Sequence, residues 1–313
     1  MSKIAIVVHG GAGPDSDLIK ENIAGYEKGL EEAVRAGYTI LECGGTSVDA
    51  VEAAVNCLEN NPLFNAGRGS VLNEAAEVEM EASIMSGKDL SCGAVAVVQG
   101  VKNPVTLARA VMEETKHVYL GGTGAMDFAR QAGIELRPNA YFITEHNYDQ
   151  FEEAATEKND RPDAAAEKQF RKKEHGTVGA VALDSEGNVA AATSTGGLEN
   201  KKRGRIGDSS IIGVGTYADN RTCAVSCTGD GEYLIQQVSA FHVYSLMEYK
   251  NLTVQEAADY LIHEKCRDVK GDMGLIAIDP QGAIGFAFNS ERMHRGWMSD
   301  TETLKTFIYP GEH

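Results

Sequence analysis

The boundary between residues 176 and 177 constrains the fold of this chain more than any other feature. Residues 151–174 read FEEAATEKNDRPDAAAEKQFRKKE, a charged, alanine-rich segment with neither glycine nor a branched aliphatic residue. Such a segment buries too little apolar surface to order itself, so we expect a flexible linker. Directly after it, residues 177–183 (TVGAVAL) predict a strand that starts at a threonine. The chain thus divides into two segments, 1–176 and 177–313.

The threonine at this boundary has a chemical interpretation as well as a structural one. An N-terminal threonine can be a nucleophile through its hydroxyl and a base through its own α-amine, whose unperturbed pKa is roughly 7.7–8.0. Thr177 would gain that amine only if its bond to Gly176 were cut. The alternative is an ordinary strand-edge threonine after a turn glycine. The motifs downstream decide between the two.

Composition and charge exclude several classes of protein. The chain has 313 residues, of which 42% are hydrophobic and 24% charged, which is typical of one or two globular domains. Its net charge of -17 opposes binding to nucleic acid or to an anionic membrane. The apolar run near the N-terminus is too short for a signal peptide, and no stretch approaches ~20 apolar residues. We expect a cytoplasmic protein.

The six cysteines contain no C-x-x-C pair, so their spacing suits neither a zinc site nor a dense disulfide framework. Reduced thiols are the expected state. The positions are Cys43, Cys57, Cys92, Cys223, Cys227 and Cys266.

The first segment predicts strands flanked by helices. Residues 4–8 form an expected strand that enters a turn at residues 9–13, HGGAG, and an amphipathic helix at 18–36 ends at Gly37. Thr46 and Asp49 form a capping box for the next helix, which ends at residues 60–62. The apolar face of that helix comprises Val48, Val51, Val55 and Leu58. Further elements are a strand at 91–99, a helix from residues 103–104 and a helix around 124–132.

The HGGAG turn allows two functional interpretations, and each of them needs a further motif. A phosphate-binding loop would need G-x-x-x-x-G-K-[ST], which is absent, and the oxyanion loop of an α/β-hydrolase would need a G-x-S-x-G elbow, which is also absent. We therefore expect His9 to be a structural hydrogen-bonding residue.

The second segment predicts hairpins. Strands at 177–183 and 189–194 flank a turn at 184–188, and strands at 274–279 and 283–288 flank residues 280–282. A strand at 223–227 enters TGDGE, residues 228–232, directly before a helix whose expected face is Leu234, Val238 and Phe241. Thr253 and Glu256 cap one further helix. Strands in the middle of both segments, with helices outside, predict two stacked sheets between helical layers.

Three motifs after Thr177 supply the remaining chemistry. TSTGG contributes the hydroxyl of Thr195, and GRIGDSS contributes opposite charges on Arg205 and Asp208. TGDGE contributes oxyanion donors, which are the Thr228 hydroxyl and the Gly229 backbone N–H. Each motif alone also fits a strand-end turn, a surface ion pair or a helix entry. Their joint occurrence after GTVGAVAL favours the catalytic interpretation.

With these motifs the chain resembles the plant-type L-asparaginases, or isoaspartyl peptidases, of the N-terminal-nucleophile hydrolases. The resemblance covers essentially the whole chain through HGGAG at 9–13, PLFNAGRGSVL at 62–72, HGTVGAVALD at 175–184, TSTGG at 193–197, GRIGDS at 204–209 and TGDGE at 228–232. It implies a four-layer αββα fold and self-cleavage between Gly176 and Thr177. It also implies assembly of two cleaved pairs, (αβ)2, and hydrolysis of L-asparagine and β-aspartyl peptides without a catalytic cofactor.

The resemblance also assigns roles to single residues. Thr177 matches the nucleophile, Thr195 its supporting hydroxyl, and Asn65 an amide beside the nucleophile. The oxyanion hole matches Thr228 and Gly229, while substrate binding matches Arg205 for the α-carboxylate and Asp208 with the Gly231 carbonyl for the α-amine. Family members can bind a structural sodium ion through backbone carbonyls, and the matching positions are Leu58, Glu59, Asn61, Phe64, Ala66 and Arg68.

Two alternatives stay open at this stage. The related glycosylasparaginases usually carry TSTNG and TGNGD where this chain has TSTGG and TGDGE. A non-catalytic protein that binds a small molecule or a nucleotide through its glycine-rich turns is the alternative from another class, and it predicts an uncut chain.

Overall fold

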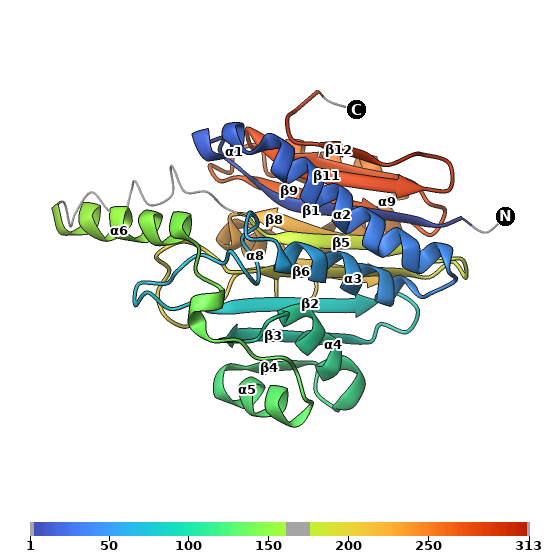
Figure 1. Cartoon of the computed structure of the whole chain (residues 1–313). Helices are drawn as coiled ribbons and strands as arrows, with labels where there is room; N and C mark the ends of the chain where they lie inside the picture. Colours follow the sequence, from blue (N-terminus) through green and yellow to red (C-terminus); the bar gives the residue numbers. More distant parts are fainter. Residues whose placement is uncertain (1–2, 161–175, 312–313) are drawn as a thin grey trace.

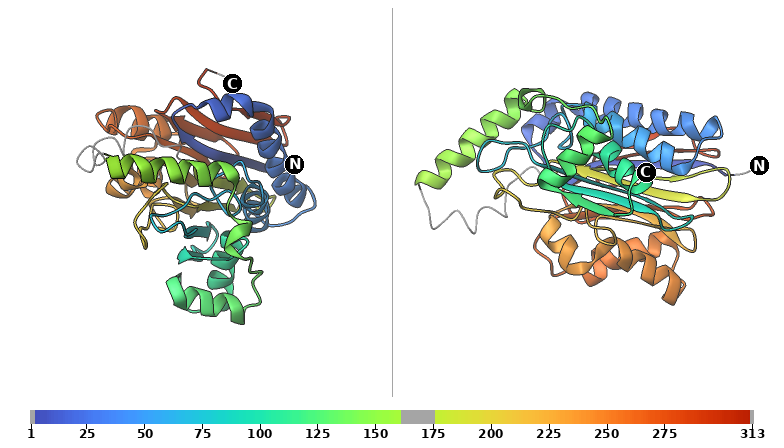
Figure 2. Two further views of the ribbon diagram at one scale, coloured as in Figure 1. Left: turned by 60° about the vertical axis from the view of Figure 1, so that its left-hand side comes forward. Right: turned by 90° about the horizontal axis from the view of Figure 1, so that it is seen from below.

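Two β-sheets stack face to face between two layers of helices in the computed structural model of the chain (Figure 1). The structure describes residues 3–160 and 176–311, and only the backbone for residues 154–160. Seen from below, the helices α2 and α3 cover one side of the stacked sheets, and the helices from the last third of the chain cover the other (Figure 2). The four-layer αββα fold expected from the resemblance is confirmed.

The larger sheet has eight strands in the order β12-β11-β1-β5-β6-β2-β3-β4. Both segments of the chain contribute strands to it, and β5 lies between β1 and β6 at its centre. Its strands are β1 Ala5–Gly13, β2 Met80–Ser86, β3 Cys92–Val98, β4 Tyr119–Gly121, β5 Val178–Leu183, β6 Val189–Thr195, β11 Arg292–Ser299 and β12 Lys305–Phe307. The strand that follows Thr177 is therefore paired on both sides.

The smaller sheet has four strands in the order β10-β9-β8-β7, all from the second segment. These are β7 Thr216–Asp219, β8 Cys223–Gly229, β9 Met273–Ile278 and β10 Ile284–Phe288. Strand β8 packs behind β5 and β6, so the TGDGE motif at its end lies close to the start of β5.

Helices α2, α3 and α4 pack on the outer face of the larger sheet, and α9 and α10 pack on the smaller one. The bounds of the helices are α1 Asp17–Glu21, α2 Ile23–Glu42, α3 Ser47–Asn60, α4 Pro104–Glu114, α5 Gly122–Gln131, α6 Glu145–Asp160, α8 Gly231–Gln237, α9 Ser239–Lys250 and α10 Val254–Asp259. The described residues also form two short helical segments, η1 Asn139–Tyr141 and η2 Tyr260–Lys265. Within the described ranges, no helix is both long and apolar enough to cross a membrane.

Strand alternation produces three apolar layers between the four structural ones. On β1, Ile6 and Val8 face the helices, whereas Ala5 and Val7 face the second sheet. A separate cluster fills the space between the smaller sheet and its helices. Because side chains of β1 are buried on both faces, this strand reads as a continuous apolar run.

Several predicted elements are confirmed at their boundaries. The capping boxes of Thr46 with Asp49 and of Thr253 with Glu256 start α3 and α10. The hairpin of β5 and β6 forms as expected. Helix α6 extends into the predicted linker as far as Asp160, and the rest of that linker, together with His175, lies outside the described residues.

The predicted turn at HGGAG is wrong, because these residues continue strand β1. A register shift between His9 and Gly11 marks a bulge, and Gly11 has a φ of 117°. Gly10 leaves no room for a side chain against the Phe64 ring. The glycines therefore serve a bulge and close packing, which sequence alone does not separate from a turn.

Two helix predictions also need correction. Helix α2 continues through Gly37 to Glu42, and a Cβ at position 37 would overlap Ile6, so this glycine allows close packing on β1. The helix after TGDGE breaks at Val238, whose φ is 50°. Of its predicted face, Leu234 is buried, but Val238 and Phe241 are exposed.

Candidate active site

The register of the β5–β6 hairpin places the two candidate threonines opposite each other. Val178 pairs with Ser194, so Thr177, one residue before β5, faces Thr195 at the end of β6. The Thr177 hydroxyl donates to the Thr195 hydroxyl over 3.3 Å, and the Gly197 N–H also donates to Thr195 at 3.0 Å. Both threonines are buried. The hairpin alone thus builds the pair.

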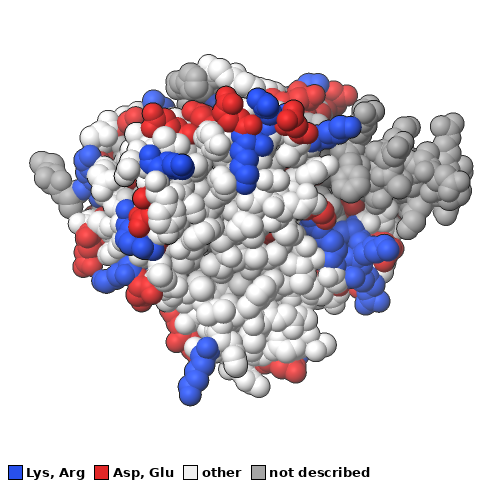
Figure 3. All heavy atoms as spheres, turned by 180° about the vertical axis from the view of Figure 1, so that it is seen from behind, with Lys and Arg blue, Asp and Glu red and all other residues white. Residues whose placement is uncertain are grey.

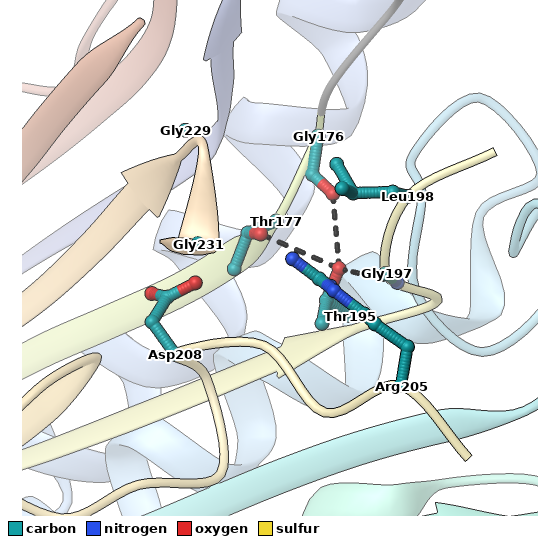
Figure 4. Close-up of a pocket in the computed structure, with 9 residues that line it drawn as sticks. All are labelled: Gly176, Thr177, Thr195, Gly197, Leu198, Arg205, Asp208, Gly229 and Gly231. Carbon is teal, nitrogen blue, oxygen red and sulfur yellow. Dashed lines mark hydrogen bonds between the residues drawn. The ribbon is translucent and has the colours of Figure 1, made fainter. Parts of the chain in front are cut away.

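A small cavity at this point collects most of the predicted site. Its lining residues are Gly176, Thr177, Thr195, Gly197, Leu198, Arg205, Asp208, Gly229 and Gly231. Arg205 and Asp208 reach it from the loop between β6 and β7 (Figure 4). Its volume is about 10 Å³ while the chain is continuous through Gly176. That space holds about one water molecule and is too small for an amino acid.

The carbonyl oxygen of Gly176 accepts hydrogen bonds from two side chains. Asn65 Nδ2 donates to it at 2.9 Å, and the Thr195 hydroxyl donates to it at 3.1 Å. Asn65 is held by its own bonds to the Gly197 carbonyl and from the Val71 N–H. The same Thr195 hydroxyl therefore contacts both the candidate nucleophile and the carbonyl next to it.

Arg205 does not form the ion pair with Asp208 that their spacing in the sequence suggests. Its Nε and Nη2 atoms donate to the two carboxylate oxygens of Glu232 at 3.0 and 2.8 Å. Glu81, buried below it, lies 3.9 Å from Nη1. Because Glu232 takes the Nε/Nη2 edge of the fork, the Nη1/Nη2 end can still receive a carboxylate.

Asp208 has the surroundings of a cation-binding carboxylate. It is 3% exposed, and its Oδ2 has no hydrogen-bond partner among the described residues. Burial, reinforced by the nearby negative charge of Glu81, raises the pKa of Asp208 to about 7, although Arg205 opposes that shift. A bound ammonium would satisfy the unpartnered oxygen and restore the charged form.

The predicted oxyanion donors lie at the end of β8. Gly229 lines the cavity, whereas Thr228 is fully buried behind it and is not among the lining residues. The Thr228 hydroxyl accepts the Ala12 N–H at 3.1 Å, which leaves its own proton available for donation. Gly229 has a φ of 127°, and a side chain there would overlap the Asp272 carbonyl. The strand end thus requires glycine.

His9 holds the backbone of the candidate nucleophile. Its Nδ1 lies 2.8 Å from the Thr177 carbonyl, which can only accept, so Nδ1 carries the proton. Its Nε2 then accepts from the Ser226 hydroxyl at 2.8 Å, and Ser226 contacts the Thr193 hydroxyl at 2.7 Å. Burial lowers the pKa of His9 to about 3, so the ring is neutral. The structural role predicted for His9 is confirmed.

The loop expected to bind sodium lies at the end of α3, on the side of Asn65. Four of its candidate carbonyls each accept one backbone N–H from the same loop; they belong to Leu58, Glu59, Asn61 and Phe64. A carbonyl has two lone pairs, so each retains one acceptor site. Gly67, with a φ of 52°, brings the loop against the Glu59 carbonyl. Oxygen donors in a compact loop suit a hard cation.

Sequence reasoning missed three charged residues that shape the site. Glu232 and Glu81 hold Arg205 and the loop at Gly207, whose N–H donates to Glu81 at 2.8 Å. Lys201, with a pKa lowered by burial to about 8, donates to the Glu79 and Gly196 carbonyls and fixes the turn after Thr195. Glu232 lies within the TGDGE motif, so its carboxylate was the feature of the sequence that could have indicated a partner for Arg205.

Comparison with known proteins identifies the family of the chain. The model of the asparaginase family matches residues 2–308. The isoaspartyl peptidase of Escherichia coli is 42% identical over 311 residues, which cover 99% of this chain and 97% of that protein. The isoaspartyl peptidase/L-asparaginase of Homo sapiens is 48% identical over 286 residues, 90% and 88% of the two chains. That of Danio rerio is 44% identical over 310 residues, 98% and 96%. This chain belongs to the asparaginase family.

Proposed function

We propose that this protein hydrolyses L-asparagine and β-aspartyl dipeptides through an ester on Thr177, after cutting its own chain before that residue. One observation carries the proposal. Seven predicted site residues from four separate motifs line one cavity around the bond to be cut, namely Gly176, Thr177, Thr195, Arg205, Asp208, Gly229 and Gly231. The names of the relatives, isoaspartyl peptidase and L-asparaginase, support the same chemistry.

Self-cleavage comes first. The Thr177 oxygen attacks the Gly176 carbonyl carbon, the peptide C–N bond breaks, and the hydroxyl proton ends on the freed amine. Asn65 Nδ2 and the Thr195 hydroxyl already contact the oxygen that becomes negative. Water then cleaves the ester and leaves a carboxylate on Gly176. A side chain at position 176 would come within 3.2 Å of the Asn65 Cβ, so glycine keeps the amide within reach.

Turnover uses the same hydroxyl with a different oxyanion site. The free Thr177 amine takes the hydroxyl proton, the oxygen attacks the side-chain carbonyl of the substrate, and Thr228 with Gly229 stabilises the oxyanion. The proton passes to the leaving nitrogen, and water releases aspartate. The free end of Arg205 fits the α-carboxylate, while Asp208 and the Gly231 carbonyl fit the α-ammonium.

Aspartate release by the purified protein tests this proposal. We expect hydrolysis of L-Asn and β-Asp-Leu, because both keep a free α-carboxylate and α-amine. N-acetyl-Asn and α-Asp-Leu lack one of these groups and serve as matched negative substrates. The test uses protein shown by mass to be cut before Thr177. If that protein releases no aspartate from either L-Asn or β-Asp-Leu, the proposed activity is refuted.

A structural sodium ion in the loop after α3 is part of the proposal. The carbonyls of Leu58, Glu59, Asn61, Phe64, Ala66 and Arg68 would hold it, and it would brace the loop that carries Asn65. Binding to the folded state alone raises stability as the ion concentration exceeds its Kd. We expect a higher Tm in NaCl than in choline chloride at equal ionic strength. Equal Tm values in the two salts would argue against the ion.

Assembly as (αβ)2 is the other structural proposal. One face of the molecule has a broad area without Lys, Arg, Asp or Glu (Figure 3). Large apolar side chains are exposed on the chain, among them Val118, Val238, Phe241 and Tyr249. Contiguous uncharged and apolar surfaces often mark protein–protein contacts, so this face is the proposed contact surface. Light scattering of the cleaved protein should give twice the mass of one chain, and a single-chain mass would contradict the assembly.

A further inference from the structure

A second cavity adjoins the catalytic one at Gly176. It has a volume of about 480 Å³, which is within the range of roughly 300–1,000 Å³ typical of ligand pockets. Gly176 lines both cavities. Asn65, which lines the larger cavity, donates to the Gly176 carbonyl. The last residue of the first segment therefore borders both a space for one water molecule and a space of ligand size.

The walls of the larger cavity combine an apolar surface with a buried cation. Apolar side chains come from α1, α2 and the loop after α3; they belong to Leu18, Tyr26, Leu63 and Val71. Arg292 on β11 also lines it and is only 3% exposed. The acidic lining residues, Glu145 and Asp149, are exposed on α6 and so lie at the rim. The guanidinium of Arg292 is therefore buried in the wall, whereas the two carboxylates lie at the rim of the cavity.

His294 does not add to the positive charge of this wall. His294 packs flat against Tyr26, with ring centroids 4.4 Å apart, and accepts a hydrogen bond from Arg292 Nη1 at 3.3 Å. Burial, together with the neighbouring Arg292 charge, lowers the pKa of His294 well below its usual value. The His294 ring is neutral, so it adds no positive charge beside Arg292.

The chemistry of turnover fixes where a leaving group must stand. As the bond from the substrate carbonyl carbon to Thr177 Oγ forms, the bond to the leaving nitrogen breaks, and the Thr177 amine transfers its proton to that nitrogen. The transfer requires a separation of about 2.6–3.2 Å. In the precursor, the atom bonded to the Thr177 nitrogen is the Gly176 carbonyl carbon. The leaving nitrogen consequently lies in the space that Gly176 vacates, at the border of the larger cavity.

We propose that the larger cavity is the subsite for the leaving amino acid of β-aspartyl dipeptides, an inference that rests on the proposed function. An apolar side chain of that residue packs against Leu18, Leu63 and Val71, and its C-terminal carboxylate points toward Arg292. Asparagine releases only ammonia and does not use this space. The cavity thus determines how well dipeptides are hydrolysed relative to L-asparagine.

Filling the cavity tests the assignment. Leu18 is a half-buried wall residue on α1, outside the catalytic groups, so Leu18→Trp reduces the space without touching Thr177 or Asn65. In fully cleaved enzyme we expect kcat/KM for β-Asp-Leu to fall about 10–200-fold, the range for a lost hydrophobic subsite contact. The value for L-Asn should stay unchanged. Leu136→Trp makes the same exchange at an exposed position that lines neither cavity, so it is the matched control and should change neither value.

The charge of the subsite is tested separately, with an uncharged substrate and with a pair of variants. β-Asp-Leu amide lacks the carboxylate that Arg292 would attract, so its kcat/KM should be lower than that of β-Asp-Leu. Leu18→Glu should depress hydrolysis of β-Asp-Leu more than Leu18→Gln does, because the two side chains differ in charge and hardly in size. Equal values for the acid and the amide would overturn the carboxylate assignment.

The outcomes separate this inference from the proposed function. If Leu18→Trp lowers β-Asp-Leu and L-Asn hydrolysis equally, or lowers neither, the subsite is overturned while the asparaginase activity stands. If the wild-type enzyme hydrolyses neither substrate, the proposed function itself fails. A selective loss of dipeptide hydrolysis supports both.

Discussion

Removing the amide of Asn65 should slow self-cleavage. In Asn65→Ala the Gly176 carbonyl loses the donor at 2.9 Å but keeps the Thr195 hydroxyl at 3.1 Å. Loss of one oxyanion donor costs ~10²–10³ in rate, or about 2.7–4 kcal/mol. We therefore expect the precursor to cut itself that much more slowly, yet not to stop.

The assay is the rate at which the fragment beginning at Thr177 appears, followed by intact mass from the moment of purification. Asn65 also accepts the Val71 N–H, so Asn65→Asp serves as a second variant that keeps this acceptor and lacks the donor. Melting curves of both precursors show whether the loop is still folded. Cleavage of folded Asn65→Ala at the wild-type rate would refute the assignment of Asn65 to the oxyanion of self-cleavage.

Three further predictions concern turnover. Thr228→Val should cut itself normally but hydrolyse L-Asn ~10²–10³-fold more slowly, because it loses a donor of the second oxyanion site. An unchanged kcat would show that Thr228 does not stabilise the oxyanion of turnover. Arg205→Lys should lower kcat/KM for L-Asn about tenfold to a hundredfold, because it loses a charge-assisted hydrogen bond of ~1.5–3 kcal/mol. Self-cleavage should stay intact. An unchanged kcat/KM would contradict binding of the α-carboxylate by Arg205. The KM for L-Asn should rise as pH falls below about 7. The reason is that Asp208 must be ionised to bind an ammonium, and burial raises its pKa to about 7. A KM that stays constant from pH 8 to 6 would contradict the assignment of Asp208 to the α-amine.

The hairpin at the centre of the site could be derived from sequence, because its signals are local. Alternating apolar residues predict both strands, and the turn at residues 184–188 sets the register that places Thr177 opposite Thr195. The capping boxes of α3 and α10 are local in the same sense. The chemistry at the start of β5 therefore follows from a few residues on either side of it.

What sequence missed depends on contacts between distant segments. Strand β2 contains Glu81 and Ser83, and both are buried because they face the loop of Asp208 rather than an apolar layer. Polar residues at buried positions of a short strand break the apolar pattern from which a strand is predicted. Similarly, Glu232 meets Arg205 only after β8 and the loop before β7 have come together. The roles of the site residues, the sodium ion, the (αβ)2 assembly and a cytoplasmic location stay predictions.

The central claim, that Thr177 becomes a chain N-terminus and the nucleophile, is tested most directly by the intact mass of the purified protein. The account predicts two fragments, the second beginning at Thr177, and a single uncut, inactive chain for Thr177→Ala. A wild-type chain that stays whole and still hydrolyses L-Asn and β-Asp-Leu at full rate would contradict it. An uncut wild-type chain that binds a small molecule without turnover would instead favour the non-catalytic alternative.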